Sequence, residues 1–473
     1  MADDASPPGM LQLTPLDPTY RADPHAVLAP MREQCPVHRD AMAGTFVISR
    51  YDDVRGIISD NSLWRDPINA EASAVMQRRF ADTVDPNLPR TSTTSILMLD
   101  NPDHARVRQP LAQALYARVA KFRPHAERII DHYLDGVAGE PSFDLMARFC
   151  VPVPVDAIAE ILGVEHDRLD DFRDWSEGVI LGLNPFRNAE QTAHMERSAV
   201  ALHEYFTALM DDRRAAPRDD LVSDMVTLQA GGAPLSDDEI RINLQALLVG
   251  GNLTTTDLIG NGVRLLLLNP GELAKLKADP KLAAGAVEEV LRYEGPVDVT
   301  GRVASRDMEV GGCPVGKTQS LTTFLRAANR DPAAFEDPDR FDITRKGKPH
   351  VSFGGGSHIC IGAPLARLEA QVALVKLFER FPNLRLADPD AEPVWRTLPF
   401  FRGLETLPVA PWSEAACLPQ REGVQLGSRE TDTGSERPWA TVRRARPCSW
   451  RADRAASTWA SPAASRARAP TSP

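Results

Sequence analysis

The stretch His350–Gln371, "HVSFGGGSHICIGAPLARLEAQ", decides the fold, because it places one thiol between a glycine-rich loop and a helix. Cys360 lies between two isoleucines, and glycines stand at positions 354, 355, 356 and 362. Apolar residues then recur at helical spacing from Pro364 to Arg380, which predicts a helix. We expect the Cys360 thiol to have a lowered pKa, because N–H groups and the helix dipole stabilise an anion there.

A thiolate at Cys360 could act as a nucleophile or as a metal ligand. The chain has six scattered cysteines, with no CxxC pair and no zinc-like spacing, at positions 35, 150, 313, 360, 417 and 448. A lone thiolate suits the axial position of a haem iron, where it favours cleavage of the O–O bond. The alternative is a small cysteine buried in a turn.

The segment "FGGGSHICIG" resembles the haem-binding signature of the cytochrome P-450 family at every fixed position. Those positions are Phe353, Gly356, His358, Cys360 and Gly362. The resemblance covers about residues 10–410 and is to the soluble bacterial type of the family. It implies a mainly α fold with a smaller β-rich region. It also implies haem b, held between a long central helix and the cysteine loop, with Cys360 as the iron ligand.

Patterns along the rest of the chain agree with that fold. "TFVISRYDDVRGIIS" (Thr45–Ser59) predicts a strand, a turn and a helix, and residues 299–324 alternate as short strands do. Asn101 and Pro102 predict the start of another helix, with Asn101 as the N-cap. Helical periodicity predicts further helices near residues 121–138, 154–162, 196–213, 219–229, 237–267, 270–278 and 283–294.

Composition narrows the class of protein and its location. The 473 residues carry a formal net charge of −11, which argues against nucleic-acid binding. We expect no membrane span, because no apolar run is long enough, and the acidic, Pro-rich N-terminus does not resemble a signal peptide. These features indicate a cytoplasmic protein.

The composition changes near residue 413, which predicts a boundary. We expect residues 1–412 to form a single catalytic domain. Residues 413–473 are rich in Arg, Ser, Ala and Pro, and lack Lys, Ile and Phe, so we expect them to be disordered. They are either a basic interaction tail or an extension without a role, and the composition favours the second.

The resemblance also implies a buried charge network near the cysteine loop. In "EEVLR", Glu289 and Arg292 share one helix face, and taken alone they would be a surface ion pair of little value. They match the Glu-x-x-Arg pair of the family, which bonds to an arginine in the connector before the cysteine loop. Arg340, in "FEDPDRF", is the expected third member.

Four cations match the positions where the family binds the two haem propionates. They are His104 and Arg108 on one helix face, Arg302 in the strand region, and His358 in the cysteine loop. Charge-assisted hydrogen bonds to carboxylates are strong. Each cation taken alone would more often be a solvated surface charge.

The stretch "LLVGGNLTTTDLIGNG" (Leu247–Gly262) resembles the oxygen-activating motif of the family's central helix. Gly250, Gly251, Asn252, Leu253 and Thr254 fill its positions, and the acid of the motif is replaced by Leu253. Thr254 is expected to handle the protons that oxygen activation requires. Our hypothesis is that they arrive by water through Asn252 and Thr254, or from Asp257 one turn further on. A kinked core helix without this role is the alternative.

The resemblance places a mostly apolar substrate pocket at residues about 65–98, 176–192, 245–249, 296–300 and 398–404. The candidate lining residues are Ile96, Leu97, Val179, Leu183, Leu248, Val249, Val297, Val299, Phe400 and Phe401. Asp298, Arg402 and Asn184 could add polar selectivity. For each of these residues, plain packing is an equally good interpretation.

Together these features predict a monooxygenase that inserts one oxygen atom of O2 into an apolar organic substrate. Its electrons would come from NAD(P)H through a ferredoxin and a ferredoxin reductase, because nothing in the chain resembles a flavin or iron–sulfur domain. Two alternatives need no acid at Leu253: a peroxide-driven peroxygenase, and a haem-thiolate isomerase or dehydratase. A haem-binding sensor without catalysis is the other alternative.

Overall fold

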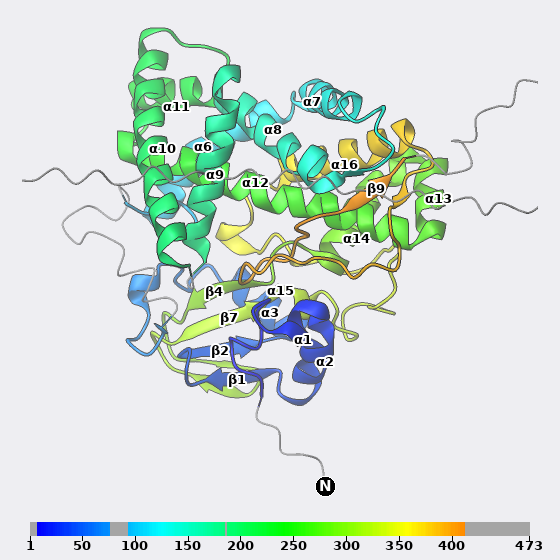
Figure 1. The fold of residues 1–473 in the computed structure, drawn as a ribbon. Helices are drawn as coiled ribbons and strands as arrows, with labels where there is room; N and C mark the ends of the chain where they lie inside the picture. The colour runs from blue at the N-terminus through cyan, green and yellow to red at the C-terminus, as the bar shows by residue number, and fades with distance from the viewer. Residues whose placement is uncertain (1–6, 76–92, 185–186, 412–473) are drawn as a thin grey trace, which may run out of the picture. The chain divides into compact units, whose positions relative to one another are not determined.

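The computed structural model describes residues 7–75, 93–184 and 187–411, and all of them belong to one compact unit. Figure 1 shows a sheet with a few short helices on one side of this unit and a larger group of helices on the other. The prediction of a mainly α fold with a smaller β-rich region is confirmed. The prediction for residues 413–473 lies outside the described residues.

The largest sheet has four strands in the order β1-β2-β7-β4. Its strands are β1 (Val37–Asp40), β2 (Thr45–Ile48), β7 (Ser320–Phe324) and β4 (Val299–Val303). β2 and β7 are parallel, while β1 and β4 pair antiparallel to β2 and β7 respectively. The helices in this region are α1 (Pro18–Ala22), α2 (Pro24–Gln34), α3 (Tyr51–Ser59) and α15 (Leu325–Ala328).

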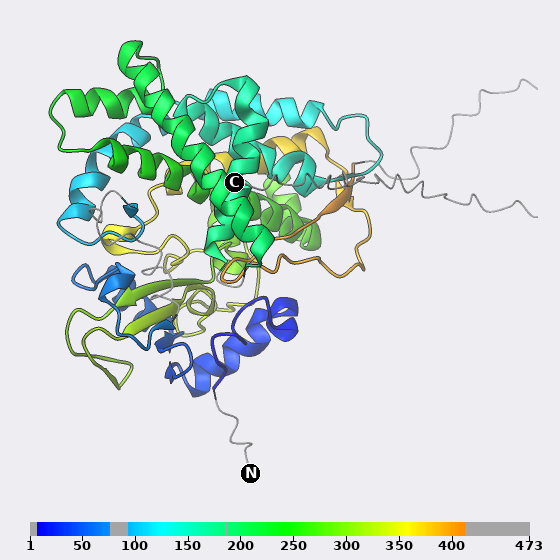
Figure 2. The ribbon, with the colours of Figure 1, turned by 60° about the vertical axis from the view of Figure 1, so that its left-hand side comes forward.

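Two smaller sheets complete the β structure. β5 (Met308–Val310) pairs with β6 (Cys313–Val315), and β9 (Pro408–Ala410) lies between β3 (Phe143–Asp144) and β8 (Arg385–Leu386). Figure 2 views the molecule from another direction and again shows the main sheet and the larger group of helices on opposite sides of the unit.

The helical part contains ten of the described α-helices. They are α6 (Asp103–Val119), α7 (Arg123–Asp135), α8 (Pro152–Leu162), α9 (Leu169–Ile180), α10 (Ala189–Ala215), α11 (Leu221–Ala230), α12 (Asp237–Leu268), α13 (Pro270–Ala278), α14 (Ala283–Glu294) and α16 (Ala363–Arg380). Short 3-10 or π turns lie at Pro67–Asn69, Met146–Cys150, His166–Arg168, Leu181–Leu183, Pro280–Leu282 and Gly356–His358.

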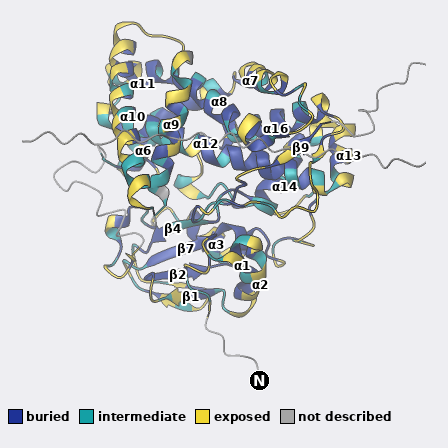
Figure 3. Ribbon diagram, in the orientation of Figure 1, coloured by how far each residue is buried: buried dark blue, intermediate teal, exposed yellow. Residues whose placement is uncertain are grey.

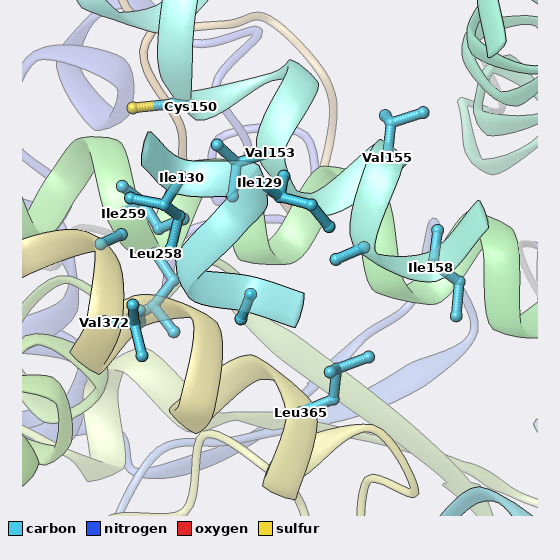
Figure 4. Close-up of a cluster of buried hydrophobic side chains, with 14 of the residues drawn as sticks. Ile129, Ile130, Cys150, Val153, Val155, Ile158, Leu258, Ile259, Leu365 and Val372 are labelled. Carbon is cyan, nitrogen blue, oxygen red and sulfur yellow. The ribbon is translucent and has the colours of Figure 1, made fainter. Parts of the chain in front are cut away.

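α12 is the central helix, and its N-terminus is fixed by a capping box. Ser236 accepts a hydrogen bond from the backbone N–H of Glu239, whose side chain accepts one from the Ser236 N–H. Most of the helix is buried (Figure 3), and it contacts α8, α14 and α16. Figure 4 shows part of this core, where Leu258 and Ile259 lie close to Ile130 and Val372.

The helices predicted from periodicity are present, as are the strand and helix predicted in Thr45–Ser59 and the strands in residues 299–324. One boundary is wrong: α6 begins at Asp103, and Asn101 does not cap it. α9 was not predicted, although Leu169, Phe172, Trp175 and Val179 recur along it at helical spacing. None of the described helices is long and apolar enough to cross a membrane.

Candidate active site

The cysteine loop is held by its own backbone and by the end of α3. The N–H of Cys360 donates to the carbonyl oxygen of Phe353 at 2.9 Å. Gly354 and Gly356 have φ angles of +70° and +62°, which favour glycine. A Cβ at Gly356 would lie 2.5 Å from Oδ1 of Asn61, and one at Gly355 would lie 3.0 Å from Ile58. These two glycines therefore allow the loop to pack against α3.

The Cys360 side chain is exposed, although it lies deep enough for burial to raise the pKa of its thiol. α16 begins at Ala363, and the backbone N–H groups of Gly362 and Ala363 act against this shift, as does Arg108. The prediction of a lowered pKa is therefore wrong for the free thiol, because desolvation outweighs the nearby donors. A metal ion bonded to the sulfur would remove the thiol proton outright.

The structure brings the four predicted propionate-binding cations together. The rings of His104 and His358 lie with their centroids 4.0 Å apart, and Arg108 donates from Nη2 to the Ile359 carbonyl oxygen at 2.5 Å. Burial and repulsion by nearby arginines, including Arg108 and Arg302, lower the pKa of His104 to about 4 and that of His358 to about 2. Both imidazoles are therefore neutral near pH 7, and the positive charge at this place is carried by the arginines.

The residues present fit a haem. The imidazole of His104 is buried, and its Nε2 atom has no hydrogen-bond partner. Within the described part of the chain, Arg108 and Arg302 donate to carbonyl oxygens and form no ion pair with a carboxylate, and no three His, Cys, Asp or Glu side chains gather as a metal site. An accessible thiol beside two arginines and two imidazoles matches one axial ligand and two propionates.

A buried ion pair braces the segment before the cysteine loop. Arg292 donates to both carboxylate oxygens of Glu289 at 2.7 and 2.8 Å, and each residue is only 3% exposed. The predicted role of Arg340 is wrong, because its exposed side chain pairs with Asp342. Arg345 takes that place and donates to Glu289 at 3.1 Å, while Arg340 contributes only its carbonyl oxygen, which accepts from Arg292.

The middle of α12 is open on one side. Gly250 is exposed although it lies within a largely buried helix, and a Cβ added there would meet nothing within 4 Å. Thr254, one turn on, is half-buried and donates from Oγ1 to the Gly250 carbonyl oxygen at 2.7 Å. Gly251 lies next to Ile158 of α8. Asn252 is buried and donates to the hydroxyl of Ser176 on α9.

Leu253, at the position of the missing acid, is part of an apolar cluster. It packs with Ile180 and Leu398, and Val249 and Phe401 lie against them. The same three buried residues, together with Asn252 and Asn184, line a cavity of about 290 Å³. An acid at this position would be surrounded by hydrocarbon on one side.

Asp257 has no exposed surface, and both of its carboxylate oxygens accept from Nη1 of Arg396 at 3.0 Å. Burial raises the pKa of Asp257 to about 6, although Arg396 acts in the opposite direction. A Cβ on Gly403 would lie 1.9 Å from this carboxylate, so the loop closes directly over it. The predicted acid is therefore enclosed by protein.

Four of the predicted pocket residues line one cavity, namely Val297, Val299, Phe400 and Phe401. The cavity has a volume of about 200 Å³, and Met10, Pro67 and Met98 extend its apolar wall. Val249 lies nearby through its contact with Phe401 and Leu253.

The other pocket predictions have different outcomes. The prediction that Leu248 lines the pocket is wrong, because this residue is completely buried in the main core and offers no surface to a ligand. Ile96 is also in this core, and its N–H donates to Asn243. Leu97 is 49% exposed, and Val179 is partly buried against the main core. The Leu183 side chain and residues 76–92 lie outside the described part.

Asp298 and Arg402 are structural rather than substrate-facing. Asp298 is completely buried, forms an ion pair with Arg326 at 2.5 Å, and accepts from the hydroxyl of Tyr20. Arg402 lies over the ring of Trp395 and pairs with Glu294. Sequence reasoning had offered both as polar selectors, and it missed Arg345 and Arg396, because a single arginine in a loop carries no signal of its partner.

Comparisons with known proteins agree with this site. A family model described as cytochrome P450 matches residues 184–394. Cytochrome P450 107B1 of Saccharopolyspora erythraea is 40% identical over 405 residues, which cover 84% of this chain and 98% of that protein. The 6-deoxyerythronolide B hydroxylase of the same organism is 35% identical, covering 83% and 96%.

The solved structure of the cytochrome P450 PksS of the Bacillus subtilis 168 bacillaene polyketide synthase superimposes with a TM-score of 0.75. It is 33% identical to this chain, and the match covers 84% of this chain and 98% of that one. The chain therefore belongs to the cytochrome P450 family, as a monooxygenase that binds haem b.

Proposed function

We propose that Cys360 is the axial iron ligand of this monooxygenase and that His104, Arg108, Arg302 and His358 bind the haem propionates. The observation that carries this proposal is an accessible thiol beside two imidazoles and two arginines, and neither arginine pairs with a carboxylate among the described residues. Bound haem supplies the activation of O2, which side chains alone do not provide. The protein supplies the ligand, the charges that fix the haem, and a dry pocket for the substrate.

On the cysteine side, the N–H groups of Gly362 and Ala363 stabilise the thiolate form of Cys360. Phe353 holds the Cys360 backbone through its carbonyl oxygen, and its ring lies below the guanidinium of Arg367 at 4.5 Å. Glu289, Arg292 and Arg345 fix the connector that leads into this loop.

On the oxygen side, Thr254 is the proposed proton carrier. Its hydroxyl donates to the Gly250 carbonyl oxygen, and its oxygen can accept a hydrogen bond from water in the open space beside Gly250. Asp257 is the proposed acid, because a carboxyl group with a pKa near 6 is partly protonated around neutral pH. Asn252 holds Ser176 and orders water behind the helix. Leu253 excludes water from the apolar side.

The proposed substrate is an apolar organic molecule that enters along Val297, Val299 and Phe400. Most of the lining of this cavity is apolar, and Arg65, Arg302 and three threonines supply its polar groups. Two of the relatives described above are named for a polyketide lactone or a polyketide synthase. Polyketide lactones are therefore the first compounds to test, followed by fatty acids, steroids, terpenoids and aromatics.

The electron source is proposed to be NAD(P)H, acting through a ferredoxin and its reductase in the reducing cytoplasm. Four of the cysteines, Cys35, Cys150, Cys313 and Cys360, are free thiols, which suits such a compartment. Because family members receive electrons near the cysteine ligand, we expect the ferredoxin to dock on the face near His350–Cys360.

The ligand is tested by adding carbon monoxide to the reduced protein. Thiolate ligation predicts a red-shifted Soret band that Cys360→Ser abolishes, and its absence from the wild-type protein would overturn the proposal. Turnover with ferredoxin, reductase and NAD(P)H then tests the electron source. Turnover with peroxide alone would favour a peroxygenase, which needs no acid at Leu253. Tight binding of ligands without turnover in either assay would favour a sensor.

A further inference from the structure

Arg65 lies beside the proposed propionate site, although no sequence motif marks it. Its Nε donates to the carbonyl oxygen of Leu97 at 2.9 Å, and its Nη1 donates to Oγ1 of Thr300 at 2.5 Å. The same Nη1 donates to the Gly301 carbonyl oxygen at 2.7 Å. Nη1 of Arg302 donates to this same oxygen at 2.8 Å. Two guanidinium groups therefore meet at one neutral carbonyl.

The positive charge of this pair is balanced only in part, by the nearby Asp100, whose charge raises the pKa of both arginines. Neither Arg65 nor Arg302 forms an ion pair with any described carboxylate, and Nη2 of Arg65 donates to no described atom. The nearby carboxylate of Asp100 accepts from the backbone N–H groups of Arg65 and Asp66, and from Asn69. Asp100 thus holds the loop, and its charge acts on the two guanidinium groups without a direct hydrogen bond to either.

Arg65 belongs electrostatically to the propionate-binding cluster. Repulsion from Arg65 contributes to the lowered pKa values of His104, His358 and Arg302. Burial lowers the pKa of Arg65 itself to about 10 and that of Arg302 to about 9. A group of like charges with little solvent is costly unless an anion joins it, and a guanidinium with free N–H groups is well shaped to bind a carboxylate.

We propose that Arg65 binds a haem propionate through its free Nη2 group, as a fifth propionate-binding side chain beside His104, Arg108, Arg302 and His358. This inference rests on the proposed propionate site. It gives the segment after Trp64 a second role: the same side chain that ties Leu97 to strand β4 also fixes the cofactor. The wall of the substrate cavity, which Arg65 and Arg302 both line, is thereby joined to the haem edge.

The test compares Arg65→Met and Arg65→Lys in the holoenzyme, with Arg306→Met as the control. Arg306 lies four residues after Arg302 and pairs with Asp60 at the surface. We expect Arg65→Met to speed haem transfer to apomyoglobin about tenfold or more, because one charged hydrogen bond is lost. Its haem reduction potential should also fall, since a cation near iron favours the reduced state. Arg65→Lys should retain the potential, and Arg306→Met should match wild type.

Other outcomes separate this inference from the site on which it rests. If Arg65→Met changes neither haem transfer nor potential, while His104→Gln and Arg302→Gln speed haem loss, only the role of Arg65 is wrong. If none of the three variants affects haem retention, the propionate site itself is wrong. If Arg65→Met weakens only the binding of a carboxylate-bearing fatty acid, the residue serves the substrate and the inference is overturned.

Discussion

Replacing Glu289 by glutamine is the sharpest test of how the cysteine side is held together. Glu289 and Arg292 are each only 3% exposed, and Glu289 also accepts from Arg345 and from the backbone N–H of Asp342. Glutamine keeps the size of the side chain but removes its charge. Two guanidinium groups, those of Arg292 and Arg345, would then share a neutral acceptor.

The size of the effect follows from burial. Removing one partner of a buried ion pair costs about 3–5 kcal/mol, and the isosteric change should lie at the lower end. The entropy of unfolding is about 2 cal/mol/K per residue, so in a unit of this size a loss of about 3 kcal/mol in stability corresponds to a fall of about 4 °C in Tm. The neighbouring Glu288 pairs with Arg367 and His350, but its side chain is 43% exposed. Glu288→Gln should therefore cost only about 0–1 kcal/mol.

The assay is thermal unfolding of the two variants and wild type as holoproteins, followed by circular dichroism and by the haem absorbance. We expect Glu289→Gln to lose haem absorbance at a lower temperature, and Glu288→Gln to follow wild type closely. Equal losses in the two variants would refute the reasoning, because they would show that burial does not distinguish the two carboxylates.

Three further predictions concern the loop, the oxygen side and pH. Gly356→Ala should lower the free energy of unfolding by about 1–3 kcal/mol, because the φ of Gly356 is +62° and Asn61 occupies the space that the new Cβ would need. Gly271→Ala is the control, since a Cβ at Gly271 would meet open space and should leave the stability unchanged. Equal urea midpoints for the two variants would contradict this prediction. Thr254→Ala should form less product per NAD(P)H than wild type or Thr254→Ser, and the relay is wrong if neither Thr254→Ala nor Asp257→Asn alters this ratio. The pKa of Asp257 is raised to about 6 in the folded protein, so its contribution to stability is full below about pH 4 and is lost as pH rises through 6. Asp257→Asn should make the free energy of unfolding depend less on pH between about 4 and 6. A pH dependence parallel to that of the wild type would contradict this prediction.

The parts that could be predicted from the sequence are those with a repeating or fixed pattern. Apolar periodicity located α12 and α16, and the spacing of Phe353, His358 and Cys360 located the loop between them. α9 was not predicted, although its apolar residues also recur at helical spacing. Such patterns indicate which face of a helix is buried, and small residues such as Ser176 and Gly178 share that face in α9.

Partners across the fold could not be predicted, because a sequence does not state which of two nearby arginines points inward. Arg340 and Arg345 lie in the same connector, yet only Arg345 reaches Glu289. The prediction of a lowered pKa for Cys360 failed for a related reason, because the sequence showed the helix N-terminus but not the depth at which the thiol is buried. Leu253 shows the opposite case, since its departure from the motif is explained by the apolar cluster that it joins.

The parallel pairing of β2 with β7 has a consequence for synthesis of the chain. Thr45 and Ser320 are hydrogen-bonded neighbours but lie 275 residues apart. At about 5–20 residues per second, the ribosome would deliver β7 about 14–55 s after β2. Throughout that interval the β1–β2 hairpin has an open edge, and Val47 and Ile48, fully buried in the finished protein, lack their cover. The N-terminal segment therefore exposes an unpaired strand edge and apolar side chains for most of the synthesis of the chain.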